Sequence, residues 1–332
     1  MDNVTHTLVG AALAEAGLRD RSPLATAALV IGANLPDVDG LAYLVLGPDE
    51  ALGLRRGWTH GVPAMAVWPF ALAAAVLAWD RWVRRRREPA AEPAKAVALL
   101  GLSALAVLTH SPLDFLNTYG VRLLMPLRDV WHYGDTLFIA DPWIWLALGA
   151  GYLVSRRRRL RSRARPARAA ALALALCAVY VAAMAGATAV SRSVVRREMA
   201  ARGTDVDRLM VGPLPLTPFR RQVVVASGAG YRLGTVDLLR RPAYRDADPA
   251  AIDSHADSPA AIAAARTRAG AVFLRWARFP VFVVPREGRG DWVAIVDARY
   301  TLDPGAGFGA LSVPLPEAIP SGDGSPNQER VR

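Results

Sequence analysis

The stretch "AVALLGLSALAVLTHSPLD", residues 96–114, joins an apolar run to a group of polar residues, and it points to the fold class. The apolar part is typical of a membrane helix, since about 20 residues of helix cross a bilayer. His110 and Asp114 follow where such a helix would leave the hydrocarbon layer. Ionisable side chains at that depth are costly and usually functional. Their purpose therefore depends on where the other histidines and aspartates lie.

The composition is more apolar than that of an ordinary soluble protein, with 53% apolar residues among 332 and a mean hydropathy of +0.21. The net charge of +11 is concentrated in two blocks, with six Lys/Arg in residues 81–95 and eight in residues 155–168. Each block lies beside an apolar segment, which is typical of cytoplasmic flanks rather than of a nucleic-acid-binding face. We therefore expect the bilayer as a partner and no nucleic acid. Cys177 is the single cysteine, which excludes an intramolecular disulfide and a cysteine metal site.

Several segments are apolar and long enough to cross a membrane. Residues 24–46 have the length but are interrupted by "NLPDVD". Irregular backbone is tolerated where it lines a polar cavity, so we expect a discontinuous helix there. The uninterrupted spans are expected at residues 61–83, 95–111, 136–154 and 169–190. Together the segments predict an α-helical membrane bundle of about five to six hydrophobic helices over residues 1–191.

Beyond residue 191 the sequence changes to short runs of mixed polarity. "RRQVVVASGAGYRLGTVDLL", residues 220–239, predicts two strands around a Gly-rich turn. Two more strands are expected in residues 271–285 and 291–302, and a loop with a short helix in residues 248–270. We therefore expect a small strand-rich α+β domain over residues 192–315 and a disordered tail over residues 316–332.

The two basic blocks also orient the bundle, because Lys/Arg flanks face the cytoplasm. With those blocks inside, most of the histidines and several aspartates map to the outer side. Neutral imidazoles mixed with carboxylates suit Zn²⁺, Mn²⁺ or Fe²⁺. The sequence therefore predicts a divalent metal ion, zinc or manganese above all, at the outer rim of the bundle. The residues that map there are His6, Asp37, Asp39, His60, His110, Asp114, His132, Asp135 and Asp141.

Each motif also has an interpretation without a metal. "THSPLD", residues 109–114, could begin a new helix with Ser111 as its N-cap and Asp114 in its first turn. His255 stands alone in a polar segment and is expected to be solvated. The other open alternatives are Asp135 and Asp141 as helix caps, His132 as an interfacial residue, and His6 as a surface residue near the terminus.

Taken together, the polar motifs resemble those of the membrane-bound metal-dependent hydrolase family, the YdjM-like proteins. The similar elements are "THTLVG" (5–10), "GANLPDVDGLAY" (32–43), "RRGWTHGVPA" (55–64), "THSPLDFLNTYGVRLLMP" (109–126) and "DTLFIADPWIW" (135–145). The resemblance is close over residues 1–155 and follows the branch that carries an extra C-terminal domain. The metal ligands that it implies are His6, Asp37, Asp39, His60, His110 and Asp114. Two residues depart from the pattern: Arg55 stands where many relatives have a histidine, and Met125 stands where they have a tryptophan.

The expected function is metal-assisted hydrolysis at the outer face of a bacterial inner membrane, by a multi-pass protein with an extracytoplasmic C-terminal domain. An aspartate that is not a ligand, Asp39 or Asp135, would act as the general base. A site at the bilayer edge favours a phosphoester or lipid-linked substrate, such as a phospholipid or an isoprenoid phosphate. The alternative is a non-catalytic metal-binding protein, with a structural metal or an ion pathway and a C-terminal domain that binds an envelope partner.

Overall fold

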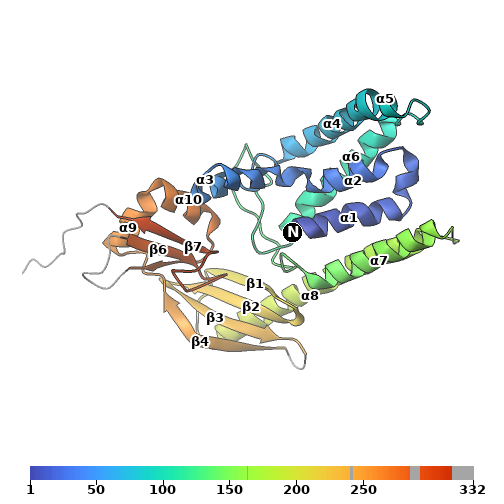
Figure 1. The fold of residues 1–332 in the computed structure, drawn as a ribbon. Helices are drawn as coiled ribbons and strands as arrows, with labels where there is room; N and C mark the ends of the chain where they lie inside the picture. Colours follow the sequence, from blue (N-terminus) through green and yellow to red (C-terminus); the bar gives the residue numbers. More distant parts are fainter. Residues whose placement is uncertain (163, 240–241, 285–291, 316–332) are drawn as a thin grey trace, which may run out of the picture. The chain divides into compact units, whose positions relative to one another are not determined.

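The chain divides into two compact units. A computed structural model describes residues 1–162, 164–239, 242–284 and 292–315, and Figure 1 shows its helices and strands. The first unit is Met1–Ile252 and the second is Asp253–Arg332. The tail predicted over residues 316–332 lies outside the described residues.

The first unit begins with a bundle of helices, which confirms the predicted α-helical bundle. Among the described residues, three helical segments are long and apolar enough to cross a membrane: Val62–Arg87, Ala96–Phe115 and Arg168–Ala201. The helices of the bundle are α1 (Asn3–Glu15), η1 (Leu18–Arg21), α2 (Ala25–Asn34), η2 (Leu35–Leu44), α3 (Pro48–Leu54), α4 (Val62–Trp79), η3 (Asp80–Arg84), α5 (Arg85–Arg87), α6 (Ala96–Phe115), α7 (Pro142–Leu160) and α8 (Arg168–Ala201).

The segment expected to span at residues 136–154 folds differently from the other three. Its helix, α7, begins only at Pro142 and continues into the arginines up to Leu160. The side chain of Asp141 accepts hydrogen bonds from the backbone N–H groups of Trp143 and Ile144. The capping alternative for Asp141 is therefore confirmed, as proline at the first helical position suggested.

The interruption expected in residues 24–46 is present. The α-helix α2 ends at Asn34, and the 3₁₀-helix η2 continues with Pro36 in its first turn. The "THSPLD" motif, in contrast, does not interrupt its helix, because α6 runs unbroken from Ala96 to Phe115 with Pro112 inside it. The alternative that Ser111 caps a new helix is therefore wrong. His110 and Asp114 stand four residues apart on one helix, so their side chains share a face.

Helices α2, α4 and α6 pack together through small and branched residues. Ala28, Leu72, Val76 and Leu99 form one buried cluster. A Cβ atom added to Gly32 would lie 2.9 Å from the Cβ atom of Ala106, so only glycine permits this approach of α2 to α6. Small residues at helix contacts are typical of membrane bundles, where close packing replaces the hydrophobic effect. This packing sets the distance between α6 and the end of α2, and it positions the polar residues there.

A four-stranded antiparallel sheet completes the first unit, in the order β1-β2-β3-β4. Its strands are β1 (Arg208–Leu214), β2 (Thr217–Ser227), β3 (Gly230–Asp237) and β4 (Ala243–Asp253). The predicted strand pair around the Gly-rich turn is confirmed, with Val223 opposite Gly234 in β2 and β3. Val195 and Met199 of α8 are buried with valines of this sheet, such as Val225. The long helix α8 therefore joins the bundle to the sheet within one unit, which does not end at the boundary expected at residue 191.

In its described residues, the second unit has two helices and a three-stranded antiparallel sheet, in the order β5-β6-β7. The elements are α9 (Pro259–Arg266), α10 (Arg268–Trp276), β5 (Pro280–Val283), β6 (Trp292–Asp297) and β7 (Ala310–Pro314). The strand expected over residues 291–302 is confirmed as β6. The strand expected over residues 271–285 is wrong in its first half, which is helix α10. The α+β character of the C-terminal region is confirmed.

Candidate metal centre

Four buried side chains from three parts of the chain point toward one place. Asp37 lies in the first turn of η2, and His60 lies just before α4. His110 and Asp114 lie one helical turn apart near the end of α6. One ligand atom of each residue falls within 4.8 Å of the others, and all four residues are buried. Motifs separated by up to 77 residues, from Asp37 to Asp114, therefore form a single centre.

The distances between donor atoms fit a small cation. Oδ2 of Asp114 lies 3.1 Å from Nε2 of His60 and 3.2 Å from Nε2 of His110. The two Nε2 atoms are 3.1 Å apart, and Oδ1 of Asp37 lies 3.6 Å and 3.9 Å from them. Ligands at about 2.0–2.2 Å from a tetrahedral ion lie roughly 3.3–3.6 Å from one another. Five of the six distances therefore differ from these values by only tenths of an ångström, and all four donor atoms lie within 4.8 Å of one another.

The outward nitrogen of each ligand histidine has a hydrogen-bond partner away from the centre. Nδ1 of His110 lies 2.7 Å from the carbonyl oxygen of Ala33, which can only accept. Nδ1 of His60 lies 2.9 Å from Oγ1 of Thr59 and 3.3 Å from Oδ2 of Asp39. A proton on each Nδ1 leaves both Nε2 lone pairs facing inward, where they would repel each other unless a cation lies between them. Partners of this kind orient the histidines of metal sites.

Unsatisfied polar atoms around the centre support the same interpretation. Among the described residues, neither oxygen of Asp37 accepts a hydrogen bond, although Nη1 of Arg55 lies 2.9 Å from Oδ1. Nδ1 of His6 is also buried without a hydrogen-bond partner in the described part of the chain. Buried polar atoms are normally hydrogen-bonded. The residues present therefore fit a divalent metal ion on the side of Asp37.

Two arginines balance the carboxylates, and the sequence patterns alone assign them no role. Arg55 pairs with both Asp37 and Asp39. Nη2 of Arg56 lies 3.0 Å from Oδ1 of Asp114, which also contacts the amine of Met1. Arg55 contacts Oδ1 of Asp37, the oxygen that also faces the two Nε2 atoms. Arg56 contacts Oδ1 of Asp114, whereas Oδ2 of Asp114 faces His60 and His110. The only sequence signal for this role is the departure at Arg55 from the family pattern.

Asp39 and His6 border the four donors. Asp39 accepts hydrogen bonds from the backbone N–H of Arg56, at 2.7 Å, and from the hydroxyl of Thr59, at 2.8 Å. It also faces the outward nitrogen of His60, so its neighbours favour an orienting role. The ring of His6 stacks on His110 at 3.9 Å, and its Nε2 lies 3.3 Å from Oδ1 of Asp114. The expectation that Asp39 and His6 bind the metal themselves stays a prediction.

Two further residues considered in the sequence, Asp135 and His255, are not among the four clustered donors. Asp135 is buried, and its Oδ2 lies 3.2 Å from Nη2 of Arg192 in α8. Its role as a general base stays a prediction. The side chain of His255 is 62% exposed, which agrees with its expected solvation.

The charge state of His60 links the centre to pH. His60 lies just before Val62–Arg87, one of the segments that are long and apolar enough to cross a membrane. Burial alone would lower the pKa of its imidazole, but hydrogen bonds with Asp114, Asp37 and Asp39 outweigh burial and raise the pKa to about 9. A proton therefore occupies this position in the metal-free protein near neutral pH. A metal ion must displace that proton in order to bind.

Comparisons with known proteins agree with the membrane architecture. Residues 1–189 match the family model described as YdjM inner membrane protein. The chain is also similar to YfhP of Bacillus subtilis (strain 168), with 27% identity over 157 residues, which is 44% of each chain. It thus matches less than half of that relative's length, and no solved structure matches it. The family match covers more than half of the chain and all four donor residues, so the chain belongs to the YdjM inner membrane protein family.

Proposed function

We propose that the protein is a membrane-bound metal-dependent hydrolase that acts on a phosphoester of an amphiphilic, lipid-linked substrate. The observation that carries this proposal is the buried set of two imidazoles and two carboxylates within 4.8 Å. A divalent ion bound there would supply Lewis acidity and lower the pKa of a water molecule. The substrate class rests on the position of the centre at the ends of apolar helices.

The protein's own residues supply orientation and charge balance. Asp39 and the carbonyl of Ala33 hold the two ligand imidazoles by their outward nitrogens. Arg55 and Arg56 pair with the carboxylates and limit the repulsion among them. Such preorganisation keeps the reacting groups in place without rearrangement during the reaction. We propose Asp39 chiefly as a positioning residue for His60.

We place the centre at the outer face of the inner membrane. Support comes from the helix ends: α4 begins beside His60 and continues to the arginines of α5, and α6 ends beside the centre. The basic end of α7 is held to α1 by Arg159, whose Nη2 lies 2.9 Å from Oε1 of Glu15. Reporter fusions after residues 88 and 160 should therefore report the cytoplasm, and a fusion after residue 200 should report the outer compartment. A cytoplasmic signal from the last fusion would contradict this topology.

The catalytic proposal is tested with purified protein reconstituted with zinc or manganese and bis(4-nitrophenyl) phosphate as the probe. We expect metal-dependent hydrolysis that chelation abolishes and that metal restores. His110→Ala should lose the activity, and His255→Ala should keep it, because only His110 belongs to the centre. Equal rates in both variants, or rates that chelation does not change, would count against hydrolysis at this centre.

A structural metal is the second candidate, and the number of donors favours it. Four buried protein ligands would fill a tetrahedral zinc site and leave no position for water, which is the pattern of structural sites. The same four ligands would leave two positions open on an octahedral ion, the geometry that suits manganese. Zinc in the purified protein, with a large loss of thermal stability on chelation and no hydrolysis, would support the structural role.

A further inference from the structure

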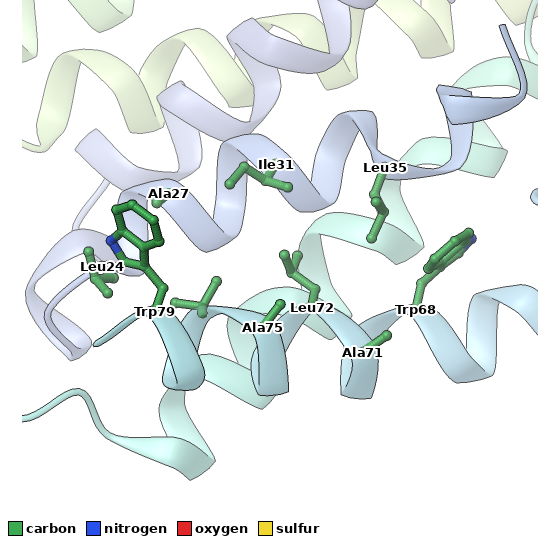
Figure 2. A pocket seen from close by; sticks show the side chains of 10 residues that line it. Leu24, Ala27, Ile31, Leu35, Trp68, Ala71, Leu72, Ala75 and Trp79 are labelled. Atoms are coloured by element: carbon green, nitrogen blue, oxygen red, sulfur yellow. The ribbon is translucent and has the colours of Figure 1, made fainter. Parts of the chain in front are cut away.

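An apolar groove runs along the bundle between helices α2 and α4. It has a volume of about 570 Å³, and every residue that lines it is apolar. Figure 2 shows Leu24 and Trp79 facing each other at one end and Leu35 and Trp68 at the other. Alanines such as Ala75 widen the groove between these ends. The second helix belongs to Val62–Arg87, which is long and apolar enough to cross a membrane, so the groove would lie within the hydrocarbon layer.

The end of the groove at Leu35 and Trp68 adjoins the metal centre. The indole N–H of Trp68 donates to the carbonyl oxygen of Thr59 at 3.0 Å, and Thr59 directly precedes the ligand His60. Leu35 stands two residues before the ligand Asp37 on the other wall. Both walls of the groove are therefore continuous with segments that supply metal ligands.

The length of the groove fits one hydrocarbon chain. Leu24 and Leu35 are eleven residues apart, which corresponds to about 16 Å along a helix that rises 1.5 Å per residue. Half of a hydrocarbon layer of about 30 Å has nearly the same thickness. The opposite end of the groove is closed by Trp79, next to the arginine-rich end of the span.

The rim of the centre is also suited to the membrane surface. The η2 segment that follows Asp37 exposes large apolar side chains, with Leu41 at 61% and Leu44 at 79% exposed. Val45, which follows Leu44, is 81% exposed, and Trp58, two residues before the ligand His60, is 61% exposed. Apolar side chains and tryptophan in such places are typical of the membrane–water interface. A lipid head group would therefore reach the centre without leaving the interface.

We propose that the groove binds one acyl chain of a phospholipid whose phosphate head group lies at the metal centre. This inference rests on the proposed function, since it names the substrate of the same centre. Every residue that lines the groove is apolar, and the groove begins beside the segments that carry Asp37 and His60 and has the length of one hydrocarbon chain. The groove thus acts as the subsite that selects a long-chain substrate.

The test uses photolabelling in bilayers. The probe is phosphatidylglycerol with a diazirine in one acyl chain, in nanodiscs that contain the full-length metal-loaded protein, and labelled residues are mapped by mass spectrometry. Ala75→Trp fills the groove and should lower labelling of Leu35 and Ile31 by about tenfold or more, because overpacking of this size costs a few kcal/mol. Ala74→Trp is the matched control, since Ala74 is also exposed on α4 but does not line the groove. Labelling should then resemble that of the unmodified protein.

Equal labelling in the two variants would overturn the proposal, because it would show only the ordinary lipid that surrounds any membrane helix. Metal content serves as the folding check, and Ala71→Phe replaces Ala75→Trp if that variant loses its metal. Failure of the groove is distinguishable from failure of the hydrolase. If bis(4-nitrophenyl) phosphate is hydrolysed but labelling does not differ, the hydrolase proposal stands and the groove proposal is wrong. If labelling depends on the groove but no hydrolysis occurs, the groove binds lipid and the hydrolase proposal is wrong. A loss of long-chain lipid turnover in Ala75→Trp with unchanged rates on the soluble ester would support both.

Discussion

At the scale of single residues, the centre combines ligands with the groups that orient them. The sequence identified all four clustered donors, because histidines and aspartates are rare beside apolar helices and therefore conspicuous. It could not separate Asp37 from Asp39, which are two residues apart in one short segment. Their difference depends on the direction of each side chain in η2: Oδ1 of Asp37 faces the Nε2 atoms of His60 and His110, whereas Oδ2 of Asp39 faces Nδ1 of His60. Contacts of that kind become visible only when the chain has folded.

The orienting role of Asp39 leads to a graded prediction. Asp39→Ala should weaken zinc binding by about 10–100-fold, as is usual when the partner of a ligand histidine is removed. Asp37→Ala should weaken it further, because a ligand itself is lost. Competition titration with a chelator of known zinc affinity measures both, and His255→Ala is the control. An affinity for zinc that is unchanged in Asp39→Ala would contradict the assigned role.

The raised pKa of His60 predicts how metal binding depends on pH. Below its pKa of about 9, His60 carries a proton that zinc must displace. The apparent affinity should therefore rise with pH, by about tenfold per unit between pH 6 and pH 8, for one released proton. Titrations at several pH values measure the slope. A flat profile would mean that no proton competes with the metal at this position.

At the scale of elements, the sequence predicted helices better than edge strands. The bundle was recognisable because apolar runs of this length seldom occur outside membrane helices. Strand β4 was missed because residues 248–253 contain Pro249, which disfavours a strand; the order β1-β2-β3-β4 makes β4 an edge strand, where proline is tolerated. Helix α10 contains aromatic residues that also favour a strand, so its pattern was ambiguous. Thr267 caps its first turn, and Phe273 and Trp276 are buried three residues apart, which is helical spacing.

The contact of α2 with α6 gives a prediction about stability. Gly32→Ala should destabilise the protein by about 1–3 kcal/mol, because the added Cβ would overpack against Ala106. Gly101→Ala on α6 is the matched control, since a Cβ there meets nothing within 4 Å among the described residues. Thermal unfolding in detergent measures both variants. Similar unfolding temperatures for the two would show that the helices do not need this close approach.

At the scale of the whole molecule, the helices place polar chemistry at one end of an apolar bundle. The arginine-rich ends of α5 and α7 are positively charged and lie away from the histidines and aspartates of the centre. The long helix α8 continues from the bundle to the first sheet. The sequence predicted this polarity from its two arginine blocks. It could not predict that the first sheet packs within the same unit as the bundle, because that depends on contacts such as Arg221 in β2. This buried side chain donates hydrogen bonds to the carbonyl oxygens of Thr136 and Met184.

The most direct test of the central claim is the metal content of the purified protein and of matched variants. Elemental analysis should find a stoichiometric divalent metal ion in the unmodified protein. His60→Ala and His110→Ala should each lose most of it, because each removes a donor from a four-ligand centre. His255→Ala should keep it, because His255 is exposed and far from the centre in sequence. The same metal content in all three variants, or no metal in the unmodified protein after growth with zinc and manganese, would contradict the metal centre.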